Sequence, residues 1–154
     1  MNRVLFNAEG ITLPSWTNAA GGYIKSVLET LDLHNWELSV LFCDNSYIKT
    51  LNAQYRNKDE PTDVLSFPLG EREPDGRLLA GDIVISLDAL EENTRFFKVS
   101  ADEELRRLLV HGILHLAGYE HKTNEADEPM LETQEKILAR LQLKLQLKLT
   151  EKVL

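Results

Sequence analysis

Cysteine, basic side chains and long apolar runs are all scarce in this sequence. The 154 residues include one cysteine, Cys43, which has no internal partner for a disulfide, so a disulfide scaffold or a dithiol redox site is not expected. Apolar runs such as 83–85 are far shorter than the roughly 20 residues of a membrane-spanning helix. Glu9 precedes any apolar stretch of signal-peptide length. We therefore expect a cytoplasmic protein that makes no contact with a membrane.

Acidic residues outnumber basic ones, 25 to 17, and the formal net charge is −8. Binding nucleic acid over a whole surface needs clustered Lys and Arg to neutralise phosphates, so sequence-independent binding of that kind is not expected. A local basic groove is compatible with this composition. Short acidic runs such as 71–75 and 125–128 are typical of solvated faces and helix starts.

The length and the absence of repeats or linkers predict one domain over residues 1–154, since a domain has roughly 150 residues. Alternating apolar residues, as in 36–42, predict half-buried strands. The strands are expected at 1–7, 36–42, 64–67 (stopped by Pro68) and 78–87. Helices are expected at 14–33, 44–56 (capped by Asp44), 88–97, from the Ser100 capping box into His111, and from Asn124 onward. This order predicts an α+β fold, with a small mixed sheet of about four strands covered by about five helices.

The C-terminal segment has two competing periodicities. Four leucines of the last helix are expected near one face: Leu131, Leu138, Leu141 and Leu145. From 141 to 149 leucine alternates with Gln and Lys, which fits a strand as well as a helix. The tail 141–154 is therefore left unassigned.

Three of the four histidines fall within eleven residues, at His111, His115 and His121. On a helix, His111 and His115 lie about 40° and about 6 Å apart on one face, where two imidazoles can reach one metal ion. A continuous helix would point His121 away from that ion, so the helix must end. Gly118 is placed to end it, because glycine enters the left-handed conformation without steric cost. We expect a metal site at the end of this central helix.

The spacing matches the H-E-x-x-H-x-x-G-x-x-H pattern of metzincin proteases except at Gly112, which stands where those enzymes have glutamate. That glutamate is their general base, so peptide hydrolysis by their route is disfavoured here. Three imidazoles with a fourth position open to water are nevertheless typical of a catalytic zinc site. A closed structural site is the alternative, with Glu120 or Asp127 as a fourth ligand.

The sequence resembles the YbeY family of bacterial rRNA-maturation endoribonucleases in three segments. The family pattern H-G-x-L-H-L-x-G-Y-D-H is met by residues 111–121, with Glu120 in place of the aspartate. Residues 51–68, L-N-A-Q-Y-R-N-K-D-E-P-T-D-V-L-S-F-P, look like a second family signature. Residues 81–86, G-D-I-V-I-S, look like the family's buried strand.

The resemblance implies a single-domain metalloprotein with zinc on His111, His115 and His121, although nickel also suits three imidazoles. It implies cleavage of single-stranded RNA near the 3′ end of 16S rRNA and a role in ribosome quality control. The implied partners are ribosomal RNA, the small ribosomal subunit and ribosome-associated proteins.

By the same matching, Arg56 corresponds to the family's arginine that is important for activity. Its fork of donors suits a phosphodiester whose charge grows in the transition state, whereas a purely local role would be a cation at a helix C-terminus. Asp63 is either a turn carboxylate or an acceptor for a histidine N–H, and Ser66 is expected to be a small strand residue. Met130 and Leu131 are expected to pack under the site.

Two further functions stay open at this point. A non-catalytic ribosome-assembly factor, whose metal stabilises the fold and whose groove binds RNA or ribosomal protein, would suit the net charge of −8 and the missing general base. A metalloprotease or another hydrolase is less well supported, because of Gly112.

Overall fold

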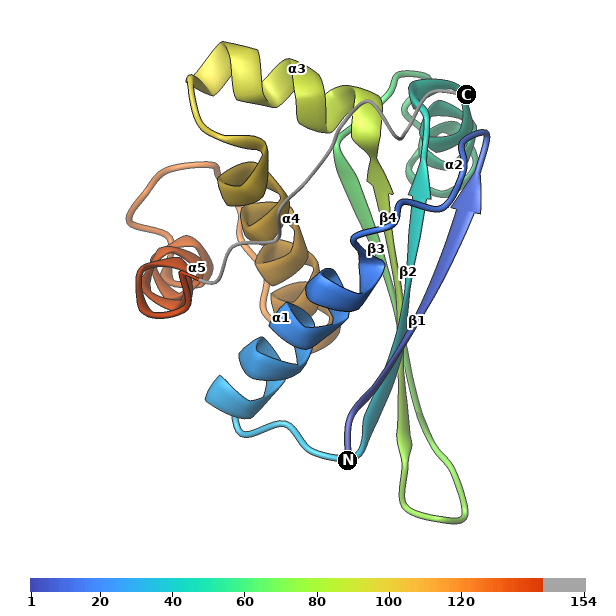
Figure 1. Ribbon diagram of the computed structural model, residues 1–154, viewed down its shortest axis with the longest axis vertical. Coiled ribbons are helices and arrows are strands. Elements are labelled where there is room, and N and C mark those ends of the chain that lie inside the picture. The colour runs from blue at the N-terminus through green and yellow to red at the C-terminus, as the bar shows by residue number, and fades with distance from the viewer. Residues whose placement is uncertain (143–154) are drawn as a thin grey trace.

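The computed structural model describes residues 1–142, and in them a four-stranded sheet is combined with five helices (Figure 1). The strands are β1 (Arg3–Glu9), β2 (Trp36–Cys43), β3 (Val64–Arg72) and β4 (Leu78–Ser86). The helices are α1 (Thr17–Thr30), α2 (Asn45–Arg56), α3 (Leu87–Phe97), α4 (Ala101–Leu116) and α5 (Pro129–Arg140). The predicted α+β class and the numbers of strands and helices are confirmed.

The sheet is mixed and has the order β1-β2-β4-β3. Strands β1, β2 and β4 run parallel, and β3 pairs antiparallel with β4 at one edge. The alternating side chains of β2 face opposite sides: Val40 joins the larger core and Cys43 joins a smaller one. Figure 1 shows α1, α4 and α5 on one side of the sheet and α2 on the other.

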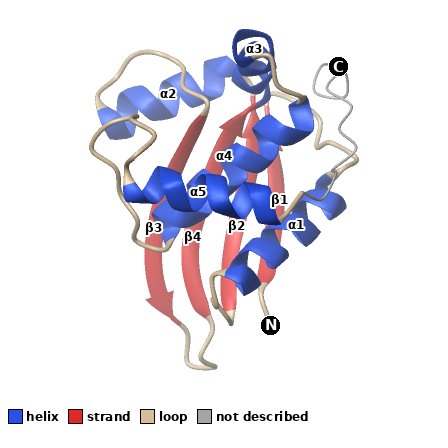
Figure 2. Ribbon diagram, turned by 90° about the vertical axis from the view of Figure 1, so that its left-hand side faces the viewer, coloured by secondary structure: helices blue, strands red, loops and turns tan. Residues whose placement is uncertain are grey.

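Helix α4 is the centre of the larger core. It packs against β3 and β4 as well as α1, α3 and α5, and Leu109 and Ile113 on it are fully buried. Figure 2 shows α4 between the sheet and α5. The Ser100 hydroxyl accepts a hydrogen bond from the Glu103 N–H at 3.1 Å, as a capping residue should. The cap fixes where the helix starts, and packing of α4 on β3 brings its C-terminal half beside that strand, where Gly112 lies next to Ser66.

Two predicted boundaries are wrong. Pro68 does not stop its strand: β3 continues to Arg72, and the pairing with β4 shifts register between Pro68 and Glu71. Proline is tolerated there because β3 is an edge strand and lies next to an irregularity. The last helix begins at Pro129 rather than near Asn124, because proline suits the first helical position.

The buried face of α5 also differs from the predicted one. Its buried residues are Met130, Gln134, Ile137 and Leu138. Leu131 is only partly buried, and the unassigned tail from 143 onward lies outside the described residues. None of the helices within 1–142 has both the length and the apolar composition needed to cross a bilayer.

Candidate metal centre

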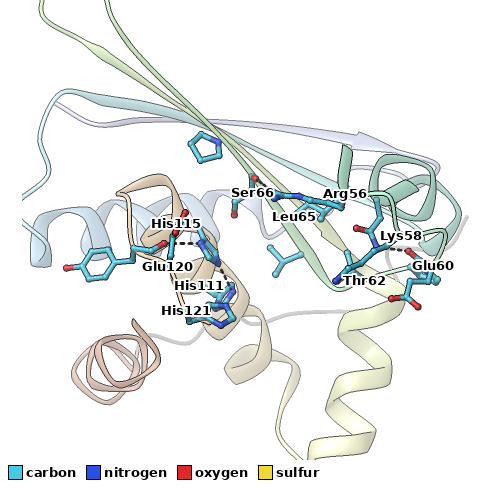
Figure 3. Close-up of a pocket in the computed structure, with 15 residues that line it drawn as sticks. Arg56, Lys58, Glu60, Thr62, Leu65, Ser66, His111, His115, Glu120 and His121 are labelled. Atoms are coloured by element: carbon cyan, nitrogen blue, oxygen red, sulfur yellow. Dashed lines mark hydrogen bonds between the residues drawn. The ribbon is translucent and has the colours of Figure 1, made fainter. Parts of the chain in front are cut away.

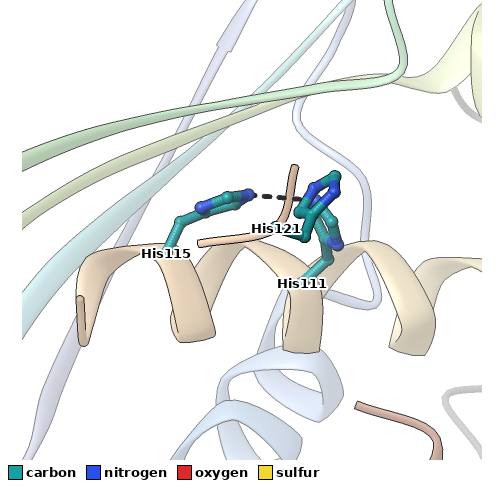
Figure 4. Close-up of side chains that lie close together, drawn as sticks. All are labelled: His111, His115 and His121. Atoms are coloured by element: carbon teal, nitrogen blue, oxygen red, sulfur yellow. Dashed lines mark hydrogen bonds between the residues drawn. The ribbon is translucent and has the colours of Figure 1, made fainter. Parts of the chain in front are cut away.

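The three clustered histidines converge at the end of α4. His111 and His115 come from successive turns of the helix, and His121 returns over them from the following loop (Figure 4). One ligand atom from each ring lies within 4.8 Å of the others. Within residues 1–142, no carboxylate belongs to this group. The structure therefore brings together the three side chains that the sequence singled out.

The chain reverses after α4 because the helix ends in a glycine motif. Gly118 has φ +96°, and its N–H donates to the carbonyl of His115 at 3.0 Å. The next N–H, of Tyr119, donates to the carbonyl of Leu114 at 2.9 Å. These paired bonds form a Schellman motif, in which glycine takes the left-handed position. The predicted helix break at Gly118 is confirmed.

Hydrogen bonds fix the same tautomer on all three rings. The Nδ1 of His111 lies 2.8 Å from the side-chain oxygen of Gln134. The Nδ1 of His115 lies 3.0 Å from the carbonyl of Tyr119, and that of His121 lies 2.8 Å from the carbonyl of Thr123. Oxygens of amide and peptide groups accept and do not donate. Each neutral ring therefore carries its hydrogen on Nδ1 and leaves the Nε2 lone pair free to bind a metal.

The spacing of two of these nitrogens fits a shared cation. The Nε2 atoms of His111 and His115 are 3.2 Å apart, and two nitrogens on one tetrahedral zinc, at about 2.0–2.1 Å each, lie about 3.3 Å apart. In this tautomer neither nitrogen has a hydrogen to donate to the other, so the contact is not a hydrogen bond between neutral rings. The donor set could hold a divalent cation with nitrogen preference.

Burial also favours the neutral, ligating form of these rings. It lowers the pKa of His111 and of His115, and the neighbouring imidazoles lower both further. Desolvation disfavours the charged imidazolium. Both rings are consequently unprotonated at neutral pH, which is the state that binds metal.

The histidines open onto a cavity of about 710 Å³. Its walls come from the end of α4, from β3 and from the loop between α2 and β3, and Figure 3 shows Arg56 and Ser66 across from His115. The charged side chains lining it are Arg56, Lys58, Glu60 and Glu120. Two basic and two acidic side chains thus line the cavity beside the histidines, whereas the chain as a whole carries a net charge of −8.

Arg56 is held in place by two contacts. Its Nη2 donates to the carbonyl of Ser66 at 2.8 Å, and its guanidinium carbon lies 5.9 Å from the centre of the Phe67 ring. The arginine is the last residue of α2, which also agrees with a cation at a helix C-terminus. Because it faces the cavity, it can meet a substrate there as well.

Other residues singled out by the sequence have different roles. The Asp63 carboxylate accepts from the Asn93 side-chain amide at 3.0 Å, and the His111 Nδ1 bonds to Gln134 instead, so the prediction that Asp63 accepts a histidine N–H is wrong. Ser66 is a buried strand residue, as expected, and its Oγ lies 3.5 Å from the carbonyl of Gly112. Met130 is buried on α5, also as expected.

Sequence reasoning missed two polar residues that shape the site. Gln134 is buried and bonds to His111 from a separate helix. Asn52 is also buried, and its side chain donates to the carbonyl of Glu60 at 2.9 Å, bracing the loop that lines the cavity. The available signal was an amide side chain on the otherwise apolar face of its helix, Asn52 on α2 and Gln134 on α5, because a buried amide requires hydrogen-bond partners.

Comparison with known proteins agrees with this geometry. The family model described as Endoribonuclease YbeY matches residues 6–142. Proteins named Endoribonuclease YbeY are 52% identical in Treponema denticola (75% of this chain, 77% of that protein) and 41% identical in Treponema pallidum (90% and 89%). A Thermotoga maritima protein of known solution structure aligns with a TM-score of 0.62 and 32% identity, over 88% of this chain and 86% of its own. The chain belongs to the endoribonuclease YbeY family.

Proposed function

We propose that this protein is a zinc-dependent endoribonuclease that cleaves single-stranded RNA during maturation of the 3′ end of 16S rRNA and in ribosome quality control. The observation that carries the proposal is the convergence of three Nε2 lone pairs on the wall of a large cavity that also contains Arg56. Relatives named Endoribonuclease YbeY support the reaction class. On this proposal the protein works in the cytoplasm with the small ribosomal subunit and ribosome-associated proteins.

His111, His115 and His121 would hold the metal through Nε2. Three neutral imidazoles suit zinc in a catalytic arrangement, and nickel is the second candidate. A zinc ion in such a site supplies Lewis acidity toward a phosphoryl oxygen and lowers the pKa of bound water. The chain's own contribution is to keep the three rings in one tautomer and in fixed directions.

Arg56 is the residue we assign to the phosphodiester. Its guanidinium presents several N–H donors in a fixed fork, and the bond to Ser66 uses only one of them. The remaining donors can bind phosphate oxygens, whose negative charge increases in the transition state. Because Ser66 and Phe67 hold the side chain before substrate arrives, little reorganisation is needed.

The proton acceptor must lie elsewhere than at position 112. Glycine has no group that takes a proton, and the two carboxylates that line the cavity are Glu60 and Glu120. Glu120, which directly precedes His121 and lines the same cavity, is the first candidate base. Water in the cavity is the second candidate acceptor.

A non-catalytic assembly factor is the second candidate function. The net charge of −8 and the lack of a proton-accepting side chain at position 112 favour it. In that case the metal would stabilise the fold, and the cavity would bind RNA or ribosomal protein without turnover.

The decisive experiment compares wild-type protein with His115→Ala and with His34→Ala as a matched control. His34 is a surface histidine whose side chain is 64% exposed and pairs with Asp32. Zinc content and cleavage of an end-labelled RNA, single-stranded or annealed to its complement, are measured on the same preparations. We expect about one zinc per chain, and cleavage of the single strand only, in wild type and His34→Ala, and neither in His115→Ala.

Two results would contradict the proposal. Wild-type cleavage rates in zinc-free His115→Ala protein would exclude a metal-dependent reaction. Zinc-loaded wild type that binds RNA but never turns over would favour the assembly factor.

A further inference from the structure

Gln134 makes a side-chain contact with the candidate metal site from outside α4 and its loop. It lies on the inner face of α5, is 6% exposed, and places its Oε1 2.8 Å from the Nδ1 of His111. The corresponding acceptors for His115 and His121 are backbone carbonyls. Among the three histidines, therefore, His111 is the one whose ring direction depends on a side chain and can be altered by one substitution.

The orientation of the Gln134 amide is itself enforced. Its Nε2 donates to the Oε2 of Glu135 at 3.1 Å, and a carboxylate can only accept. The amide must therefore direct its NH₂ group to Glu135 and its oxygen to His111. Reversing the amide would break the bond to Glu135 and place a donor against the Nδ1–H of His111.

Arg107 of α4 holds Glu135 in turn. The Nε and Nη2 of Arg107 donate to the two carboxylate oxygens of Glu135, at 3.0 Å each, and its Nη1 donates to Glu103 at 3.1 Å. Forked pairs of this kind have a defined geometry. The hydrogen bond from Arg107 also lowers the pKa of Glu135, so Glu135 stays an acceptor at neutral pH.

We propose that Gln134 is a positioning residue for the metal, and that the Glu135–Arg107 pair locks its amide so that the His111 Nε2 faces His115 and His121. The inference rests on the proposed metal site and extends it. Helix α5 then does more than cover the core: its register on α4 sets the direction of one ligand. Side chains that hydrogen-bond a ligating histidine in this way fix its ring and raise its affinity for metal.

The test measures zinc affinity by competition with a chelating dye, a readout that needs no RNA. Gln134→Met keeps the length and volume of the side chain but removes the acceptor. We expect it to bind zinc about 10- to 100-fold more weakly, the range found when such partners are removed. Exchanging the two residues, Gln134→Glu with Glu135→Gln, keeps an acceptor on His111 and the charge of α5, and should restore most of the affinity.

Glu132→Gln is the matched control. Glu132 lies on the exposed side of α5, and its substitution removes one charge from the same helix without touching Gln134. Zinc affinity should equal that of wild type. Wild-type zinc affinity in Gln134→Met would overturn the inference and leave the proposed function standing. Wild-type protein that binds no zinc would contradict both the inference and the proposed zinc-dependent function.

A measurement on the unaltered protein avoids any folding defect of the variants. Nitrogen-15 NMR of the metal-free wild type at neutral pH reports which imidazole nitrogen of His111 carries the hydrogen. We expect the Nδ1–H form in wild type and a mixture of tautomers in Gln134→Met. A predominant Nε2–H form of His111 in wild type would contradict the inference.

Discussion

Gly112 lies against Ile83 so closely that a Cβ at position 112 would be 2.9 Å from both the Cδ1 and the Cγ2 of that isoleucine. Ile83 belongs to β4 and is fully buried. Position 112, where metzincins carry their glutamate, is therefore packed on the sheet here. A side chain at this position would require Ile83 to move.

Gly112→Ala should destabilise the protein. Overpacking a tight core contact costs about 1–3 kcal/mol, and with two Ile83 atoms at 2.9 Å we expect the upper part of that range, above the gain of about 1 kcal/mol in helix propensity. The free energy of unfolding, measured by urea denaturation of the metal-free protein, should fall. Ile83→Val removes the Cδ1 contact, so in the double variant the loss should be smaller than the sum of the two single losses. A stabilised Gly112→Ala protein would contradict the packing described.

Arg56→Ala should lower the cleavage rate about 10²- to 10³-fold, the loss typical when a donor to a developing oxyanion is removed. Zinc stoichiometry should not change, because Arg56 is not among the metal-binding group. Arg56→Lys keeps the positive charge but loses the forked pair of N–H donors. Its cleavage rate should lie between those of wild type and Arg56→Ala. Arg95→Ala is the control, since Arg95 lies on α3 and pairs with Glu91. Rates are compared under single turnover, and an unchanged rate in Arg56→Ala would remove the assigned role.

Local signals made the metal cluster predictable. His111, His115 and Gly118 are separated by fixed steps of one helix, so helical geometry alone sets two rings side by side and ends the helix at the glycine. Asp44 and Ser100 likewise precede helices whose first turns they cap. Each of these features depends on only a few consecutive residues.

Long-range packing explains what the sequence did not reveal. Gln134 reaches His111 across 23 positions, and although its place on the apolar face of α5 marks it as buried, nothing local indicates that this face packs on α4. Whether Pro68 ends a strand depends on its lying at the sheet edge, which is decided by the order of all four strands. The partner of Asp63 is set by the packing of α3 against the loop that contains Asp63.

Gly118→Ala should weaken both folding and zinc binding. An alanine in the left-handed region costs roughly 1–2 kcal/mol, and any shift of the turn displaces His121, which follows it by three residues. Gly22→Ala is the matched control: Gly22 lies inside α1 with no atom within 4 Å of an added Cβ, so alanine should stabilise by about 0.5–1 kcal/mol. Thermal unfolding and zinc titration of both variants measure whether Gly118→Ala, but not Gly22→Ala, loses stability and zinc affinity. Unaltered zinc affinity in Gly118→Ala would show that the turn tolerates the substitution.

Glu104→Gln should stabilise the protein at neutral pH. Glu104 on α4 is 3% exposed, and burial raises the pKa of its carboxyl, although Asn93 donates to it at 2.9 Å and Arg107 lies 3.6 Å away. A carboxyl whose pKa is higher in the folded state binds more protons when folded, so its charge costs stability at pH 7. The neutral glutamine avoids that cost and keeps an acceptor for Asn93.

The pH dependence of the stability gain shows whether it comes from the raised pKa of Glu104 or from the loss of one negative charge in general. The advantage of Glu104→Gln over wild type should shrink as the pH falls from 7 toward the ordinary glutamate value of 4.5, because Glu104 in the folded protein then becomes protonated. Glu103→Gln removes the same charge beside the same Arg107 from a side chain that is 40% exposed, and should change the free energy of unfolding by less than about 1 kcal/mol. Urea denaturation across this pH range measures both, and an advantage that grows as the pH falls would contradict the raised pKa.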